Sequence, residues 1–193
     1  MTWLWTEAQS AAVRWKALFD DLEGQVEAAE RADLDSEVRD RTRREAGLVS
    51  TVDRLRAATG APIVVTTGAG AVRGLLLDAG RDWLLLEEGP GRDALVPLAA
   101  VLTVTGVGRR AAAPADRVGE RLDLRWALRG LARDRTALQV LLRDGTVLAG
   151  TLDRVGADHV DLAEHPQGEL RRAGAVSGVR LVTLDGLAVL RSA

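Results

Sequence analysis

Cysteine is absent from all 193 residues of this chain. Its absence excludes disulfides, a thiolate nucleophile and cysteine-ligated zinc together. The two histidines, His159 and His165, leave little for a histidine-rich metal site. We therefore expect neither a metal ion nor a cofactor.

Long apolar runs and secretory features are missing too. No run of about 18 apolar residues occurs, which argues against a membrane-spanning helix. The opening stretch MTWLWTEAQSAAVRWK places the acidic Glu7 before the basic residues, the reverse of a secretory signal. We expect a cytoplasmic protein with no membrane partner. Lys16 is the only lysine, a bias typical of high-GC bacterial genomes, and the chain resembles uncharacterised proteins of such bacteria.

Signatures of catalysis are equally scarce. The sequence holds no serine elbow, Walker loop, paired-carboxylate motif or histidine beside a plausible nucleophile. GAGAVRG, residues 68–74, has glycines of a dinucleotide fingerprint, but it lies in a predicted hairpin and not at a strand-to-helix turn. We predict a protein that is not an enzyme and that has no small-molecule substrate.

The composition that remains is that of a globular protein. Hydrophobic residues make up 47% of the chain and charged residues 28%, a balance that can bury a core. The formal charge of -2 and the pI near 5.8 give no global attraction to nucleic acid or anionic lipid. Any such binding would need a local basic patch.

Helical periodicity occupies the first 58 residues. Apolar residues recur at spacings of three and four between Trp15 and Val26. ERADLDSEV then offers capping residues for a second helix, predicted from about Leu34 to Ala58. We expect an N-terminal helical hairpin or arm over 1–58. Most aromatic residues gather in its first helix, where they form either an exposed protein-binding anchor or the hairpin core: Trp3, Trp5, Trp15 and Phe19.

The apolar period changes from about 3.6 to 2 after Thr59-Gly60, which indicates strands. Residues 59–108 are predicted as strands separated by glycine-rich turns. Residues 109–121, with Gly, Pro, Ala and charge, are predicted as a linker. Residues 122–193 are predicted as a helix, LDLRWALRGLARD, followed by strands again.

The two strand regions match each other. Gly74 and Gly150 are 76 positions apart (150 − 74), and the same offset relates further pairs: Leu55 and Leu131, Val64 and Val140, Leu76 and Leu152, Gly80 and Gly156, Asp82 and Asp158, Leu86 and Leu162. LVPLAAVLTV from residue 95 matches LVTLDGLAVL from residue 181 at an offset of 86 (181 − 95). This agreement predicts an internal duplication, each copy a short helix and about five strands.

The segment VLLRDGTVLAGTLDRVGADHVDL resembles the first motif of the Sm-like (LSm) family: a strand, an Asp-Gly turn, a glycine-bent strand and a third strand opened by an aspartate. The matching residues are Gly145, Gly150, Leu152, Asp158 and Val160, and in the first copy Gly74, Leu76, Asp82 and Leu84. The resemblance implies small SH3-like barrels and RNA binding by rings of subunits. The family's base-reading asparagine has no counterpart, because Asp161 and Leu85 are the nearest residues and Asp161 would repel phosphate.

The predicted fold is therefore α+β. An N-terminal helical hairpin over 1–58 is followed by two tandem five-stranded Sm-like or SH3-like small β-barrels, at 59–108 and 122–193, each led by a helix. The linker 109–121 joins the two barrels.

Arginines form the candidate nucleic-acid surface. Arg125, Arg129 and Arg133 lie four apart on the predicted helix and so share one face. Five more residues would extend this strip, two in the linker, two in a long loop and one at a loop edge: Arg109, Arg110, Arg171, Arg172 and His159. The interpretation that we prefer is a solvated helix face for the arginines, and for His159 a ring packed on a neighbouring strand or subunit.

The sequence thus predicts a non-catalytic binding or assembly module: a protein–protein adaptor, or a self-assembling scaffold that forms homo-oligomers through exposed strand edges. The alternative function is an RNA- or DNA-binding regulator that uses the arginine strip.

Overall fold

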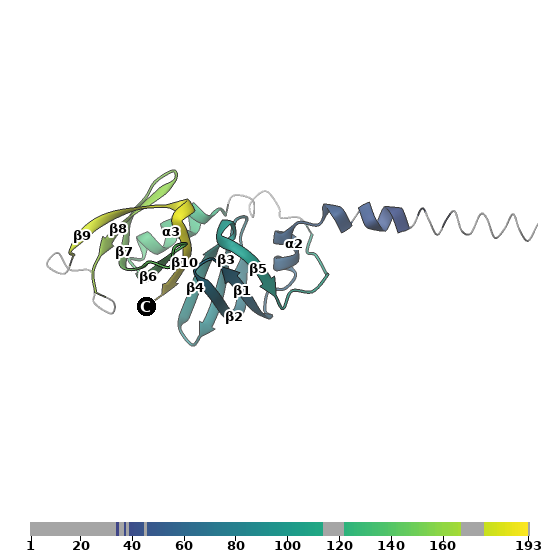
Figure 1. Ribbon diagram of the computed structural model, residues 1–193, viewed down its shortest axis with the longest axis horizontal. Coiled ribbons are helices and arrows are strands. Elements are labelled where there is room, and N and C mark those ends of the chain that lie inside the picture. The colour runs from purple at the N-terminus through teal and green to yellow at the C-terminus, as the bar shows by residue number, and fades with distance from the viewer. Residues whose placement is uncertain are drawn as a thin grey trace, which may run out of the picture. The chain divides into compact units, whose positions relative to one another are not determined.

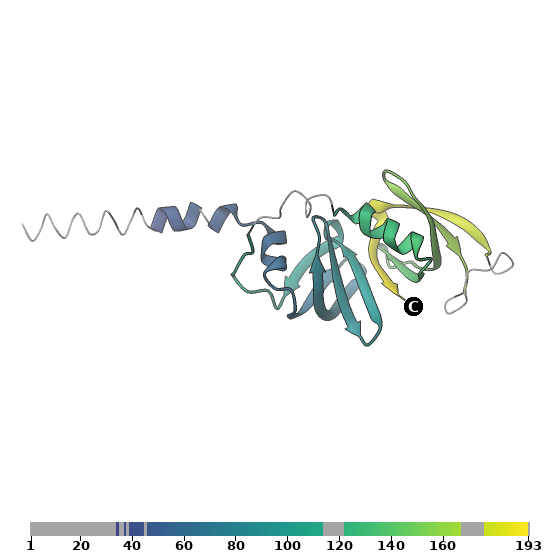
Figure 2. The same ribbon diagram turned by 180° about the vertical axis from the view of Figure 1, so that it is seen from behind.

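The structure is a computed structural model. It describes residues 34, 37, 39–44, 46–113, 122–166 and 176–192. The chain divides into two compact units, Met1–Val49 and Ser50–Ala193. The described residues of the first unit are helical from 39 to 44 and from 46 to 48, and their side chains are exposed. The second unit carries the strands (Figures 1 and 2).

The predicted N-terminal helical hairpin is wrong. A continuous helix from Leu34 to Ala58 does not form, because Ser50 is extended (φ -78°, ψ 156°) and its hydroxyl caps a new short helix, α2 (Thr51–Arg56). Leu48 and Val49, which a hairpin would bury, are exposed. Leu55 of α2 is buried instead in the core of the strand-bearing unit.

Ten strands form one antiparallel sheet. Its first five are β1 (Pro62–Thr67), β2 (Gly70–Ala79), β3 (Trp83–Gly89), β4 (Arg92–Pro97) and β5 (Val101–Thr105). After α3 (Leu124–Arg133) come β6 (Ala137–Leu142), β7 (Val147–Val155), β8 (His159–Glu164), β9 (Gly178–Thr183) and β10 (Leu187–Ser192). Short 3-10 turns, η1 (Leu98–Ala100) and η3 (Leu184–Gly186), precede β5 and β10. The strand order is β5-β1-β2-β3-β4-β10-β6-β7-β8-β9.

The prediction of two tandem closed barrels is also wrong. β10 of the second half pairs with β4 of the first half as well as with β6, so the two sets of strands merge into a single open sheet. A closed barrel would have to pair its own edge strands. Here the edge strand of one half is used to join the other, and the sheet ends at β5 and β9.

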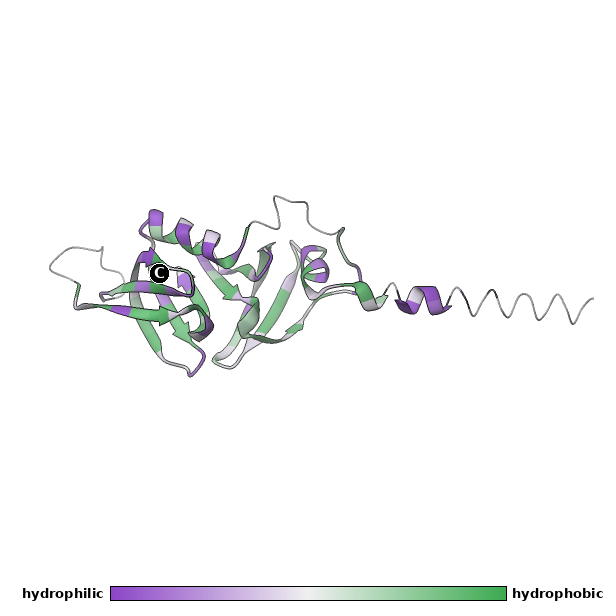
Figure 3. Ribbon diagram, turned by 90° about the horizontal axis from the view of Figure 1, so that it is seen from above, coloured by the Kyte–Doolittle hydropathy of each residue, from purple (hydrophilic) through white to green (hydrophobic). Residues whose placement is uncertain are grey.

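In β1 and β6 burial alternates along the strand, so that one face lies in a core. In β1, Ile63, Val65 and Thr67 are buried while the residues between them are less so. The β6–β7 hairpin turns at Asp144-Gly145, where Gly145 adopts φ +88° and the Asp144 carboxylate accepts the N–H of Thr146 at 2.9 Å. Figure 3 shows hydrophobic residues running along the strands.

The buried residues form two hydrophobic clusters, one for each half of the sheet, and each half contributes to both. Ala188 and Val189 of β10 belong to the cluster of the first half. Trp83 and Leu95, from β3 and β4, belong to the cluster of the second half. The junction between the halves is therefore part of the core.

Candidate functional site: the joint and the free edges of the sheet

The joint between the halves is the pairing of β4 with β10. Leu190 lies opposite Leu95, and Arg191 opposite Ala94. The Arg191 guanidinium donates to the Glu88 carboxylate at 2.6 Å, and the Ser192 hydroxyl accepts the N–H of Asp93 at 2.8 Å. Leu95 and Leu190 are buried. The joint thus combines backbone pairing, an apolar contact and a part-buried ion pair.

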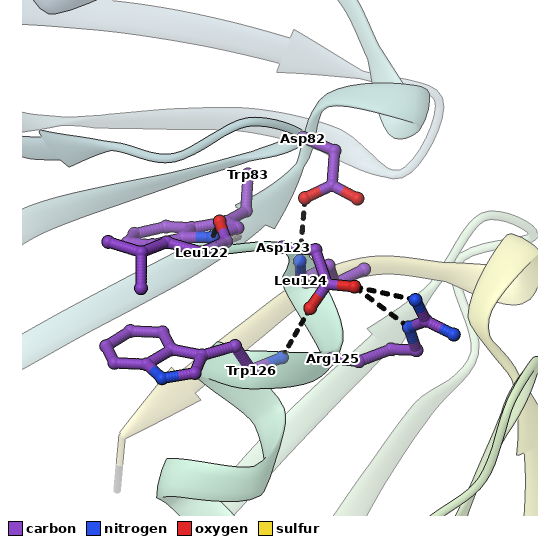
Figure 4. Close-up of polar contacts among 7 residues, drawn as sticks. All are labelled: Asp82, Trp83, Leu122, Asp123, Leu124, Arg125 and Trp126. Carbon is purple, nitrogen blue, oxygen red and sulfur yellow. Dashed lines mark hydrogen bonds and ion pairs between the residues drawn. The ribbon is translucent and has the colours of Figure 1, made fainter. Parts of the chain in front are cut away.

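The turn before β3 also holds the start of α3 (Figure 4). The Asp82 carboxylate accepts the N–H of Leu124 at 2.6 Å, and the Trp83 indole N–H donates to the Leu122 carbonyl at 2.9 Å. The N–H of Leu124, which has no partner within the helix, is satisfied in this way, and the Leu122 carbonyl also accepts the N–H of Arg81 at 3.4 Å. The first half therefore fixes the position of the helix that leads the second half.

Asp123 caps α3 from within the second half (Figure 4): its carboxylate accepts the N–H of Trp126 at 2.8 Å and the guanidinium of Arg125 at 2.8 Å. Burial alone would raise the pKa of Asp123. The hydrogen bonds from Arg125 and Trp126, with the charges of Arg125 and Arg129, outweigh burial and hold that pKa below its ordinary value. Asp123 is thus a charged cap at the positive end of the helix dipole.

The strands of the two halves correspond in order. The offset is 75 for β1 and β6, because Val65 pairs with Val104 as Val140 pairs with Leu190, so the predicted match of Val64 with Val140 is one residue out. Backbone register shifts occur between Leu76 and Asp78 in β2 and between Leu152 and Arg154 in β7, which are 76 positions apart. The 3-10 turns η1 and η3 begin at residues 98 and 184, which are 86 apart. By these offsets β9 is the counterpart of β4, and β10 is the counterpart of β5. The two strands that join the halves therefore have counterparts at the two ends of the sheet.

Those end strands carry apolar side chains in solvent. Leu102 of β5 is 68% exposed and Leu181 of β9 is 60% exposed. Their counterparts at the joint, Ala188 and Leu95, are 0% and 5% exposed. β5 has no charged residue and neither strand has a proline, and the one charged residue of β9, Arg180, is paired with Glu164. The free edges are therefore built like the strands that already pair.

A groove lies beside the β5 edge. It measures about 440 Å³ and runs between α2 and the η1–β5 segment. Apolar residues form most of its lining, and one charged residue, Arg54, stands in it: Thr51, Arg54, Leu55, Leu98, Val101, Leu102, Thr103, Val104 and Val107.

The predicted arginine strip is brought together only in part. Arg125, Arg129 and Arg133 all lie on the exposed side of α3, but Arg125 pairs with Asp123 at 2.8 Å and Arg133 with Asp134 at 3.6 Å. Arg109 and Arg110 are exposed in the segment after β5.

His159 opens β8 and is half-buried. Its Nδ1 lies 2.8 Å from the Asp158 carboxylate, and this hydrogen bond holds the pKa of Asp158 below its ordinary value. Six predicted site residues lie outside the described residues: Arg171, Arg172, Trp3, Trp5, Trp15 and Phe19.

Sequence reasoning did not single out the residues of the joint, the edges and the groove. Leu102, Leu181 and Arg54 carry no motif. Their importance depends on which strands end the sheet. The 86-residue offset, which relates Leu102 to the buried Ala188 and Leu181 to the buried Leu95, was the available signal for the edges.

Two further features bear on chemistry. Within the described ranges, no cluster of three or more His, Asp or Glu residues could hold a metal ion. Among the described helices, none is long and apolar enough to cross a membrane.

No family model and no curated protein matches this chain. The resemblance to the Sm-like family therefore stays a prediction made from the residues.

Proposed function

We propose that the chain is a non-catalytic, self-assembling scaffold, in which β9 of one copy pairs with β5 of the next. The observation that supports this proposal is the pairing of β4 with β10 inside one chain. β9 and β5 are the counterparts of these two strands, and both have one unpaired edge. The pairing of β4 with β10 within one chain can therefore be repeated between two copies, as a pairing of β9 with β5.

The internal joint specifies the register of the proposed pairing. Leu190 opposite Leu95 translates, at the offset of 86, into Val104 opposite Leu181 of the next copy. Arg191 opposite Ala94 translates into Thr105 opposite Arg180. The two edges differ, so the association is head-to-tail and either closes into a ring or continues as a filament.

Exposed apolar area supplies the driving force. Full burial of a leucine side chain contributes roughly 1.5–3 kcal/mol, so covering Leu102 and Leu181, each more than half exposed, contributes roughly 1–2 kcal/mol apiece. Val179, 62% exposed on β9, adds a third such side chain. A change of about 1.4 kcal/mol in the free energy of association changes the dissociation constant about tenfold, which light scattering can measure.

Light scattering coupled to size-exclusion chromatography tests the proposal. We expect the wild-type mass to be a multiple of the 20.6 kDa chain. Leu181→Lys and Leu102→Lys should each weaken association by roughly 5- to 30-fold. Val147→Lys is the matched control, because Val147 is also exposed but lies on an interior strand of the sheet. A wild-type mass of one chain at every concentration would overturn the proposal.

Nucleic-acid binding is the second candidate function. The observation that favours it is Trp126, which is 52% exposed on α3 beside Arg125 and Arg129 and could stack on a base. A salt-dependent shift of random-sequence RNA, lost in an Arg125/Arg129/Arg133 triple alanine variant, would support it. The absence of binding at low salt would remove this candidate.

A cytoplasmic location is part of the proposal. Fractionation of cells that produce the tagged chain tests it.

A further inference from the structure

The groove between α2 and β5 has a filled counterpart in the second half. There, the helix α3 and the η3–β10 segment enclose Trp83, Leu85 and Leu95 of the first half, all of which pack in the second cluster. The residues around them include Leu131, Leu184, Leu187 and Leu190. Three residues of the groove lining are the counterparts of Leu184, Leu187 and Leu190: Leu98, Val101 and Val104. The groove is thus the second instance of a site that the chain fills elsewhere with its own side chains.

The counterparts of the three filling residues are His159, Asp161 and Leu181. In β8, Val160 and Leu162 are buried in the core, so His159 and Asp161 lie on the other face of the strand. Asp161 and Leu181 are directly opposite each other on β8 and β9. Leu181 is largely exposed, and Asp161 is half-buried. The three side chains therefore lie together beside the free β9 edge, in the arrangement that Trp83, Leu85 and Leu95 have beside β4.

Two residues of the proposed contact are complementary in charge. The filling residue Leu85 has Asp161 as its counterpart, and the groove lining holds one charged residue, Arg54 of α2. The Arg54 guanidinium is held at the groove by two hydrogen bonds to the Gly108 carbonyl, at 2.9 and 3.2 Å. Within the described part of the chain, neither Arg54 nor Asp161 makes an ion pair. An acid on the inserting surface thus matches a base in the groove.

Building on the proposed function, we propose that the α2–β5 groove is the receptor for His159, Asp161 and Leu181 of a second copy of this chain, and that Arg54 recognises Asp161. Leu181 enters the apolar lining as Leu95 does at the joint. The Arg54–Asp161 pair takes the place of the Glu88–Arg191 pair, whose counterparts are Glu164 and Thr105 and cannot form a salt bridge. Glu164 instead pairs with Arg180 of its own strand pair.

Charge reversal tests this recognition. Arg54→Glu and Asp161→Arg should each weaken self-association by about tenfold to a hundredfold, because each places like charges together in a desolvating contact. The double variant Arg54→Glu/Asp161→Arg should associate again, within about tenfold of the wild type. A mixture of the two single variants should also associate, since each groove then meets an edge of opposite charge. Arg73→Glu, on an exposed site of the interior strand β2, is the control for net charge.

The outcomes separate the two proposals. A wild type that stays monomeric overturns both. If the wild type associates, and Leu181→Lys disrupts the association while Arg54→Glu does not, the edge pairing is supported and the proposal that the groove is the receptor is overturned. Failure of the double variant to recover, with each single variant folded by circular dichroism, also overturns the recognition of Asp161 by Arg54.

Discussion

Gly74 and Gly150 are the positions at which the equivalence of the two halves can be tested through stability. Each lies in the second strand of its half, where the next strand crosses closely. A Cβ at Gly74 would overlap the Glu87 carbonyl oxygen and lie 2.8 Å from its carbon; at Gly150 it would overlap the Ala163 oxygen and lie 2.9 Å from its carbon. Glu87 and Ala163 are themselves 76 positions apart. Both obstacles are backbone, so only a movement of the strand can relieve them.

We expect Gly74→Ala and Gly150→Ala each to be destabilising. Overpacking that forces a backbone shift costs roughly 1–3 kcal/mol. The lower chain entropy of alanine in the unfolded state offsets about 0.4–1 kcal/mol of this. The net loss is then roughly 0–2.6 kcal/mol with a central value of about 1.3 kcal/mol, which for a unit of this size lowers the Tm by roughly 3–5 °C. Thermal unfolding followed by circular dichroism measures the change.

Gly89→Ala is the matched control, because a Cβ there meets only the guanidinium of Arg92, at 3.7 Å and beyond. Its Tm should stay close to that of the wild type. Two results would refute the reasoning: a Gly150→Ala variant as stable as Gly89→Ala, or a large loss at Gly150 with none at Gly74. The second would mean that the two halves do not share the strand crossing.

Three further predictions concern α3 and the joint. Asp123→Ala should lower the unfolding free energy by about 1 kcal/mol through loss of the cap. Because folding lowers the pKa of Asp123, its contribution is complete above about pH 4 and is lost as pH falls through the folded-state pKa, so Asp123→Asn should flatten the acid limb of a stability–pH curve. Gly130→Ala, with open space around the new methyl group, should raise stability by about 1 kcal/mol in urea unfolding. Arg191→Met should destabilise by leaving Glu88 part-buried without its partner, and the added change Glu88→Gln should recover part of the loss, measured as a double-mutant cycle.

Local features of the sheet were predictable from the sequence. Asp144-Gly145 marks a hairpin because glycine tolerates the positive φ that the turn needs. LDLRWALRGLARD marks a helix because Leu124 and Leu128 recur on one side, and these residues are buried in α3. Such features depend on residues that are close in the sequence, so the sequence pattern alone predicts them.

The joint was not predictable in this way. β10 pairs with β6 of its own half, and whether its other edge closes on β9 or joins β4 depends on contacts between residues about 95 positions apart, such as Leu190 and Leu95. The apolar pattern of the strands is the same in both cases. The predicted barrels failed for this reason. The helical hairpin failed because the apolar positions Leu48 and Val49 fit a helical stripe whether or not anything covers them.

The internal joint and the proposed joint between copies differ in their charged residues, and this difference would keep the two pairings separate. If both were alike, an edge of one chain could displace the internal pairing of another, and the order of the strands would be ambiguous. The chain instead places Glu88 with Arg191 at the internal joint, and Asp161 with Arg54 at the two free surfaces. A free β9 edge that approached the internal site would bring Asp161 to the place that Leu85 occupies in an apolar cluster, where an unpaired carboxylate is costly. Specificity then comes from the cost of the wrong pairing as much as from the gain of the right one. Under the proposed self-association, the same backbone geometry is used twice, once to join the two halves of one chain and once to join one copy to the next.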